Sequence, residues 1–459
     1  MLKKRFLATA LSGVLALSAL AACSDKETSK PAEGSKDKKT VELSLMLTPQ
    51  WKGVMDPTEQ GADYDSFFKY AADKFSKQYK DYDVKVNVEV IASDQRDELL
   101  NVKLNGGTPP DIFFESTFAM GDYAHRGALV PLNDIVDDAA KKDIDQNYWD
   151  SVTFGKDIYF YPFSHMPGTF AYNADMLKAA GLEKYIGGEN EIKTWTLEEY
   201  ETILKTLKSK SANDVYPMGL YALNNQADTW NLAYLRMFGN EFFDKKGNIV
   251  LDDAKGVKAA EWLKKTYDAG LTNPGAESVS SNDVLAMFKN QKVAIAFTNS
   301  VLFNNTKAEM NEGKAPKFDI RLANIPSESG DPLTFTYVTG AAVFNTQDET
   351  RIKVSKDFVK FFSTDPELVK ASKNGVPVRT SVANEFKSEY PLFEAYDKNA
   401  PYLFNFTGSV PGYSQLRQVL YPELQAIFTG QKSPEQAIKD YQKNGNQVIK
   451  EAKENSVIK

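Results

Sequence analysis

The residue types that usually carry catalysis occur in this chain without the spacing that catalysis needs. The two histidines, His125 and His165, lie forty positions apart, so a histidine-based metal site is not expected. The motifs GxSxG and HExxH and the phosphate-binding Walker loop do not occur. Residues 243–253, FDKKGNIVLDD, lack the alternating acids of a calcium loop and predict a hairpin turn around Lys246-Gly247. The sequence therefore predicts no metal and no cofactor.

Planar polar side chains gather close to an indole in the stretch LYALNNQADTWNLAYL. Asn224, Asn225, Gln226 and Asp228 precede Trp230 at the expected start of a helix. Carboxylate and amide groups can bind the hydroxyl groups of a ligand, and an aromatic ring can cover an apolar face of it. The cluster therefore favours a ligand-binding platform. The alternative is that Asp228 caps the helix and Trp230 packs inside the fold.

The only cysteine, Cys23, ends an apolar run at the start of the chain. Residues 1–22 begin with the basic segment KKR and continue as an apolar run, which is typical of a secretory signal and too short for a confident membrane span. Residues 20–23, LAAC, resemble the lipobox of bacterial lipoproteins, whose cysteine is acylated. The resemblance implies a signal peptide over 1–22 and a lipid anchor on Cys23, because two or more acyl chains attach a protein stably. A cleaved signal followed by a chance cysteine is the alternative.

The segment that follows the cysteine predicts a flexible tether. Residues 23–40 are rich in Lys, Asp, Glu, Ser, Pro and Gly and contain no large apolar side chain. Removing 1–22 takes away three positive charges and changes the formal charge from −7 to −10. An acidic exported body argues against a nucleic-acid partner. The length predicts two or three domains with enough core to fold without a disulfide.

The order of the predicted elements is that of an α/β protein. Residues 41–47 alternate as a strand, 64–79 place apolar side chains on one helical face, and 83–91 alternate again. A strand, a helix and a strand at this spacing predict a parallel pair joined by a right-handed crossover. Helices dominate the second half, and no internal repeat occurs, which disfavours an adhesin or structural lipoprotein.

At this point the chain resembles the extracellular solute-binding proteins of ABC transporters, in the large sugar-binding branch that includes maltose-binding protein. The resemblance extends from about Val41 to the C-terminus and lies in the order of its pieces. These pieces are GGTPPDIFFES, YAHRGALVPLND, DIYFYPFSHMPGTFAYNADMLKAAGL, TWTLEEY, MFKNQKVAIAFTNS, YVTGAAVF, SKDFVKFFSTDPE and KNGVPVR.

The resemblance implies two α/β lobes, joined by two or three crossing segments, with the solute in the cleft between them. It places lobe one at 41–161 plus 297–344 and lobe two at 162–296 plus 345–459. The crossings are expected near Tyr161-Pro162, near Ala296 to Asn299 and near Phe344-Asn345. Because ligands of open α/β sheets sit beyond the carboxyl ends of the strands, the loops after strands should carry the binding groups.

The residues and the resemblance together give the candidate site. The expected ligand-binding residues are Trp51, Glu115, His165, Asp228, Trp230, Asn299 and Tyr413, with Phe404 and Phe406 as weaker candidates. Structural alternatives exist for Trp51, as a ring folded over a loop, for Glu115, as a solvated loop carboxylate, and for His165, as a satisfied core histidine. Trp195 and Trp262 are interpreted as core residues.

The function implied is that of a lipid-anchored, monomeric receptor of an ABC importer, which captures a sugar or oligosaccharide and delivers it to the permease. A phosphorylated or acidic polyol is the first alternative, for which Arg379 and Arg417 are the available cations. The second alternative is a cell-surface glycoside hydrolase. That enzyme would need two facing carboxylates, and no pair stands out among the 62 acidic residues.

Overall fold

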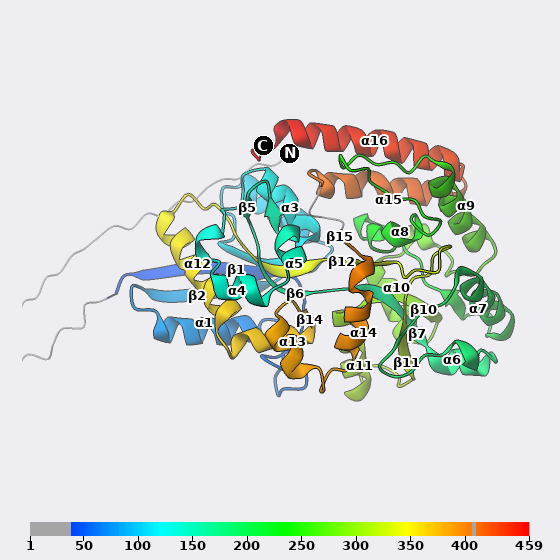
Figure 1. The fold of residues 1–459 in the computed structure, drawn as a ribbon, viewed down its shortest axis with the longest axis horizontal. Coiled ribbons are helices and arrows are strands. Elements are labelled where there is room, and N and C mark those ends of the chain that lie inside the picture. Colours follow the sequence, from blue (N-terminus) through cyan, green and yellow to red (C-terminus); the bar gives the residue numbers. More distant parts are fainter. Residues whose placement is uncertain (1–37, 406–409, 459) are drawn as a thin grey trace, which may run out of the picture. The chain divides into compact units, whose positions relative to one another are not determined.

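Two β-sheets, each with its own hydrophobic core, organise the chain (Figure 1). The computed structural model describes residues 38–405 and 410–458, and every element below belongs to the unit Lys39–Lys459. We call the parts built on the two sheets lobe one and lobe two. Among the described residues, no helix is long and apolar enough to cross a membrane.

Lobe one is built on a six-stranded sheet of order β14-β6-β13-β3-β1-β2. β1 pairs in parallel with β2, as the sequence predicts, and β13 runs antiparallel between β3 and β6. The strands are β1 (Thr40–Leu47), β2 (Asp83–Val90), β3 (Ile112–Ser116), β6 (Tyr161–His165), β13 (Val338–Val343) and β14 (Val376–Pro377), with the small pair β4 (Thr153–Phe154) and β5 (Asp157–Ile158). The helices are α1 (Ser66–Gln78), α2 (Arg96–Asn105), α3 (Thr117–His125), α4 (Asp138–Asp143), α5 (Gln146–Ser151), α12 (Glu349–Thr364) and α13 (Thr380–Phe386), with the 3-10 turns η1 (Asn133–Ile135) and η5 (Leu368–Asn374).

Lobe two is built on a five-stranded sheet of order β8-β11-β7-β10-β9. The strands are β7 (Gly168–Asn173), β8 (Ile192–Lys193), β9 (Tyr216–Met218), β10 (Val293–Asn299) and β11 (Ile320–Ala323), with the separate pair β12 (Thr334–Thr336) and β15 (Leu403–Asn405). The helices are α6 (Ala174–Ala179), α7 (Leu197–Lys210), α8 (Asp228–Tyr234), α9 (Ala254–Asp268), α10 (Ser281–Lys289), α11 (Ser300–Asn311), α14 (Leu392–Asn399), α15 (Tyr413–Thr429) and α16 (Pro434–Asn455). The 3-10 turns are η2 (Glu183–Tyr185), η3 (Asn225–Ala227), η4 (Ala276–Ser278) and η6 (Ala400–Tyr402).

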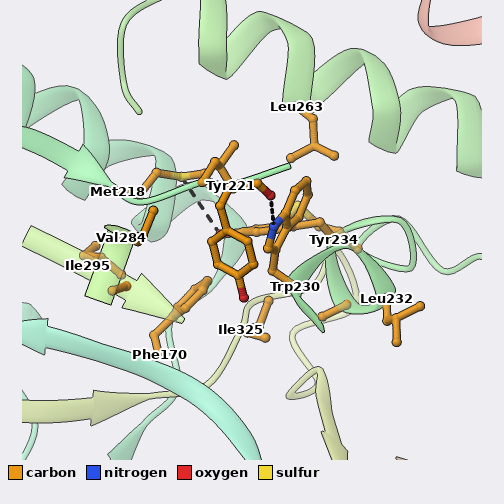
Figure 2. Close-up of a cluster of buried hydrophobic side chains, with 14 of the residues drawn as sticks. Phe170, Met218, Tyr221, Trp230, Leu232, Tyr234, Leu263, Val284, Ile295 and Ile325 are labelled. Atoms are coloured by element: carbon orange, nitrogen blue, oxygen red, sulfur yellow. Dashed lines mark hydrogen bonds between the residues drawn. The ribbon is translucent and has the colours of Figure 1, made fainter. Parts of the chain in front are cut away.

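Aromatic side chains fill both cores. In lobe one, the apolar face of α1 places Phe67 and Phe68 against Phe362 of α12. Figure 2 shows the core of lobe two, where Trp230 lies beside Tyr221 and donates its indole N–H to the Tyr221 carbonyl oxygen at 2.8 Å. The predicted α/β class therefore holds, and each sheet has a core large enough to fold around.

The strand pairing divides the chain between the lobes differently from the sequence prediction. Residues 297–323, expected in lobe one, complete β10, α11 and β11 of lobe two. Residues 345–386, expected in lobe two, form α12, η5, β14 and α13. Buried side chains of α12 and η5 lie in the core of lobe one, although Val376 of β14 packs into the core of lobe two. The predicted division between the lobes was wrong because an apolar run predicts a buried strand but does not indicate which sheet that strand joins.

The crossings between the lobes move with this division. The first lies between β6 and β7, the second between β12 and β13, and the third between α13 and α14. The first two run side by side, because the Met166 N–H donates to the Tyr337 carbonyl oxygen at 3.0 Å and the Thr334 hydroxyl donates to the Gly168 carbonyl oxygen at 2.8 Å. The predicted crossings at 161–162, 296–299 and 344–345 are therefore replaced by 165–168, 336–338 and 386–392.

The close approach of β13 to β6 gives a test of this sheet. A Cβ on Gly340 would lie 2.1 Å from the Tyr161 carbonyl oxygen, at the register shift between the two strands. We expect Gly340→Ala to lower the free energy of unfolding by about 1–3 kcal/mol, the range for overpacking. Urea unfolding measures the change. In the matched control, Gly188→Ala, the nearest atom to the new Cβ is 3.6 Å away, and equal losses in both variants would contradict the expectation.

Candidate functional site

A cavity of about 200 Å³ lies between the ends of strands from both lobes. Lobe one contributes Thr48, Pro49, Gln50, Ser93, Arg96, Glu115 and Ser116. Lobe two contributes Tyr221, Gln226, Ser281, Asn282, Val284, Leu285, Phe297, Asn299, Val301, Leu302 and Arg417, and the crossings contribute Met166 and Tyr337. The lining groups follow β1, β2, β3, β9 and β10, which is where an open α/β sheet places a ligand.

The wall from lobe one is a chain of hydrogen bonds that ends on a carboxylate. Gln50 donates to the Thr48 hydroxyl at 3.1 Å, and this hydroxyl donates to Oε2 of Glu115. The other oxygen of Glu115 accepts from the Ser116 N–H at 2.7 Å and from the Ser116 hydroxyl at 2.9 Å. Among the described residues, the buried amide oxygen of Gln50 has no hydrogen-bond partner. Since a buried acceptor without a partner is costly, a ligand hydroxyl suits this position.

The wall from lobe two combines an amide with a row of aromatic rings. Asn299 caps α11 through its side-chain oxygen, which accepts from the Leu302 N–H at 2.9 Å, and its amide nitrogen donates to the Tyr337 hydroxyl at 2.8 Å. Phe297 stacks on Phe335 with centroids 5.1 Å apart, and Phe335 stacks on Tyr337 at 6.3 Å. Phe297 and Tyr337 reach the cavity and offer it an apolar surface.

Two buried guanidinium groups bring charge to the cavity, and carboxylates from both lobes hold them. Arg96 donates to Asp97 at 2.9 Å and lies 3.7 Å from Glu115, all within lobe one. Arg417 of α15 pairs with Asp228 at 2.7 Å in lobe two and lies 3.7 Å from Asp97. Asp97 is therefore the carboxylate shared between the lobes.

The electrostatics follow from burial and this pairing. Burial raises the pKa of Asp97, but the charges of Arg96 and Arg417 outweigh it and hold that pKa below its ordinary value. Burial lowers the pKa of Arg96, yet Asp97 and Glu115 shift it upward overall. For Asp228 burial dominates, and its pKa is raised in spite of Arg417 and of the hydrogen bond from Tyr413. The two guanidinium groups and their carboxylate partners therefore interact mainly with one another.

Of the seven expected ligand-binding residues, Glu115 and Asn299 line the cavity, and so do Gln226 of the predicted platform and Arg417, the cation of the alternative solute. Asp228 and Tyr413 lie directly behind the cavity. The Tyr413 hydroxyl donates to Asp228 at 2.6 Å, and Asp228 in turn holds Arg417, which lines the cavity. Asp228 was predicted as a ligand contact or a helix cap, and the structure gives it instead the role of neutralising a buried arginine.

Trp51 and Trp230 are packed inside the lobes and do not line the cavity. The Trp51 ring stacks on Phe163 with centroids 5.8 Å apart and meets Phe114 edge-on at 5.9 Å. Trp230 lies in the core of lobe two (Figure 2). Both indoles therefore have packing roles in this structure, since both side chains are 4% exposed or less.

His165 lies at the first crossing and not at the cavity wall. Its Nδ1 is 3.1 Å from the Thr336 hydroxyl of the second crossing, and its ring lies 4.9 Å from that of Tyr148. Burial lowers the pKa of His165 to about 3, so the imidazole is neutral at physiological pH. A neutral, hydrogen-bonded histidine therefore joins two of the crossing segments.

The remaining candidates lie elsewhere. Phe404 receives the guanidinium of Arg236 on its ring at 3.8 Å, away from the cavity. Arg379 binds Asp143 at 3.1 Å and the Ser363 carbonyl oxygen at 2.8 Å within lobe one, so it is not a cation of the cleft. Phe406, Cys23, the signal peptide and most of the tether fall outside the described residues. Trp195 and Trp262 are core residues, as predicted.

Sequence reasoning missed several lining residues. Thr48 and Gln50 lie three positions and one position before Trp51 in the loop after β1, and the prediction named the indole instead of them. Arg96 begins α2, and its position after β2 was the available signal. Tyr337 could not be recognised, because its role depends on the second crossing running beside the first. The described residues contain no cluster of three or more metal-ligating side chains.

Comparisons with known proteins agree with this geometry. The family model described as bacterial extracellular solute-binding protein matches residues 58–367. The arabinooligosaccharide-binding protein of Bacillus subtilis (strain 168) is 22% identical over 302 residues, which span 65% of this chain and 66% of that protein.

Solved structures of solute-binding proteins share the fold of this chain. A solute-binding protein of an ABC transporter from Thermotoga lettingae TMO, bound with α-D-tagatose, has a TM-score of 0.74 at 19% identity and covers 90% of this chain and 100% of its own. One from Agrobacterium radiobacter K84, in complex with ribitol, has a TM-score of 0.69 at 19% identity with the same coverage. The two-lobed α/β fold predicted from the sequence is confirmed.

The placement of Trp51 gives a test that separates packing from binding. Among the described residues its indole N–H has no partner, so Trp51→Phe keeps an aromatic ring in place and removes an unpaired donor. We expect this variant to stay within about 1.5 kcal/mol of the parent, whereas Trp51→Ala should lose about 3–5 kcal/mol of unfolding free energy. Urea unfolding and solute titration check both. A large loss of affinity in Trp51→Phe at unchanged stability would show that the indole contacts the solute.

Proposed function

The chain belongs to the bacterial extracellular solute-binding protein family, and from this premise we propose that it is the sugar-binding receptor of an ABC importer. The observation that carries the proposal is the cavity between the lobes, where hydroxyl, amide and carboxylate groups face an aromatic wall. Such a lining matches the hydroxyl edges and C–H faces of a sugar or polyol. Relatives that bind an arabino-oligosaccharide, α-D-tagatose and ribitol support this class of solute.

The charges at the cavity favour a neutral solute over an anionic one. The ion-pair network of described side chains contains two guanidinium groups, Arg96 and Arg417, and three carboxylates, Asp97, Glu115 and Asp228. Because each guanidinium is already paired with a carboxylate, neither is left to neutralise an added phosphate or carboxylate. The phosphorylated or acidic polyol considered from the sequence is therefore the less favoured solute.

The size of the cavity favours a small solute in this arrangement of the lobes. Its volume of about 200 Å³ lies below the range of about 300–1,000 Å³ that ligand pockets commonly span. A single sugar or a short polyol is the best match. An oligosaccharide would need the lobes further apart, at the same lining groups.

The lining also supports a binding role over hydrolysis. A glycoside hydrolase needs two carboxyl groups on opposite sides of the scissile bond. Among the described residues that line the cavity, Glu115 is the sole carboxylate, and hydrogen bonds from Thr48 and Ser116 hold it. We propose that the solute is held and released unchanged.

Delivery then rests on an equilibrium between two arrangements of the lobes. A solute that contacts both lobes favours the closed form over the open form, as any ligand that prefers one state must. In our proposal the permease engages this closed form. A lipid on Cys23 keeps the monomeric receptor at the extracellular face of the cell membrane through the tether 23–40.

A solute panel tests the proposed function. The chain from Ser24 onward contains every described residue, and its melting temperature would be measured with neutral sugars, polyols, oligosaccharides, sugar phosphates and amino acids. A solute at a hundredfold over its dissociation constant should add about 2.7 kcal/mol to the stability. We expect a neutral sugar or polyol to act and to be recovered intact. Stabilisation by sugar phosphates alone, or cleavage of a saccharide, would contradict the proposal.

The carboxylate at the end of the hydrogen-bond chain gives a site-specific test. Glu115→Gln keeps the shape of the side chain but replaces the charged carboxylate, which accepts from Thr48, with a neutral amide. We therefore expect the affinity for the solute to fall about tenfold or more. Isothermal titration measures the change. Glu98→Gln, a matched change at an exposed position of α2, should leave the affinity unaltered. Equal affinities in the two variants would exclude Glu115 from the site.

The anchor on Cys23 gives a separate test in cells. We expect Cys23→Ser to lose incorporation of labelled palmitate and to move the protein from the membrane fraction to the medium, because no acyl chain can be attached. Immunoblotting of the fractions, with the unmodified chain as control, measures the shift. Retention of Cys23→Ser at the membrane would point to another means of attachment.

A further inference from the structure

The helix that carries Arg417 begins without a cap from its own lobe. α15 starts at Tyr413, and its N-cap residue is Gly412, which has a φ of 83° and offers no side chain. A helix start leaves several N–H groups without partners inside the helix, so they need acceptors from elsewhere. For α15 these acceptors come from lobe one.

Asp122 of α3 supplies them. Its Oδ1 accepts from the Gly412 N–H at 2.7 Å and from the Tyr413 N–H at 2.9 Å, and its Oδ2 accepts from the Ser414 N–H. The residue is 5% exposed, and α3 packs against α15 (Figure 1). A carboxylate at a helix N-terminus also interacts favourably with the helix dipole.

The same helix α3 holds the other end of the α15–α16 pair. The Val457 N–H donates to the His125 carbonyl oxygen at 2.9 Å, and the Ser456 hydroxyl lies 2.9 Å from Nδ1 of His125. Lobe one therefore fixes both the start of α15 and the chain segment that follows α16. The pair is therefore held at both ends from lobe one, in addition to its packing in the core of lobe two.

The capped turn leads directly to the cavity. Tyr413, whose N–H bonds Asp122, donates its hydroxyl to Asp228 at 2.6 Å. Arg417, one turn further along α15, lines the cavity and pairs with Asp228 at 2.7 Å. A shift of the first turn of α15 would therefore move both Tyr413 and Arg417 relative to Asp228 of α8.

We propose that Asp122 is a positioning residue for solute binding, which caps α15 from the opposite lobe and thereby sets Arg417 against the cavity. The inference rests on the proposed function for its binding readout. Asp122 has no contact with the cavity itself and acts through α15.

Burial of the Asp122 carboxylate opposes the hydrogen bonds that it accepts from α15 and limits their net strength. Burial raises the pKa of Asp122, and although the three N–H donors lower it, the net direction is upward. Desolvation of the carboxylate thus opposes the gain from its hydrogen bonds. A receptor has to release its solute, so contacts between its lobes must be able to separate again. Hydrogen bonds whose gain is partly offset by desolvation meet that need.

The experiment compares Asp122→Ala and Asp122→Asn with a matched helix cap that stays within one lobe. Asp137 caps α4 of lobe one by accepting from the Ala140 N–H at 2.9 Å, so Asp137→Ala removes a cap without touching lobe two. For each variant the affinity and the dissociation rate are measured with the best solute of the panel. Hydrogen exchange of residues 410–417 is measured without solute.

We expect Asp122→Ala to speed up exchange at the start of α15 and to weaken the affinity about 10- to 100-fold, through a faster dissociation rate, since bonds to a charged acceptor are lost. Asp122→Asn keeps one acceptor oxygen and should fall in between. Asp137→Ala should lower the melting temperature while exchange in 410–417 and the affinity stay at the parent values.

Unchanged exchange in 410–417 for Asp122→Ala would overturn the proposal, and this readout needs no solute. Faster exchange with an affinity within about twofold of the parent would overturn the positioning role. If the unmodified chain binds nothing in the panel, the proposed function fails, whereas exchange still decides whether Asp122 holds α15.

Discussion

Burial of two guanidinium groups at the boundary between the lobes is the constraint on which the site depends. A buried charge is strongly unfavourable unless carboxylates neutralise it. Asp97 of lobe one lies 3.7 Å from Arg417 of lobe two and also accepts from Arg96 at 2.9 Å. The complete pairing needs the two lobes to face each other as they do here. Neutralising these arginines therefore contributes to the arrangement that forms the cavity.

This pairing determines what the cavity can offer a solute. Because Arg96 and Arg417 are engaged by carboxylates, the groups left to face a ligand are mainly hydroxyls, amides and rings. Gln50 has an unpaired amide oxygen among the described residues, and Tyr337 ends a row of stacked rings. Such groups match hydroxyl edges and C–H faces better than they match charge. The pairing that neutralises the arginines across the lobes is thus also the basis on which we propose a neutral solute.

The crossings connect this chemistry to the movement expected of the lobes. Met166 and Tyr337 line the cavity and belong to neighbouring crossings, which bond to each other through the Met166 N–H and the Tyr337 carbonyl oxygen. His165 adds a further bond there as a neutral imidazole, because burial lowers its pKa to about 3. A solute that contacts Tyr337 therefore touches the segment about which the lobes would turn.

Features that depend on neighbours along the chain could be predicted from the sequence. The alternation of 41–47 and the apolar face of α1 gave the parallel β1–β2 pair, and the order of motifs gave the family and the two-lobed fold. Glu115 and Asn299 were predicted because both stand at strand ends, and both line the cavity. The division into lobes, the packing of Trp51 and Trp230, and the roles of Arg96, Asp97 and Asp122 came from the fold alone. These depend on which sheet a strand joins and which charges meet across the lobes, and contacts between residues far apart in the chain leave no periodic pattern in it.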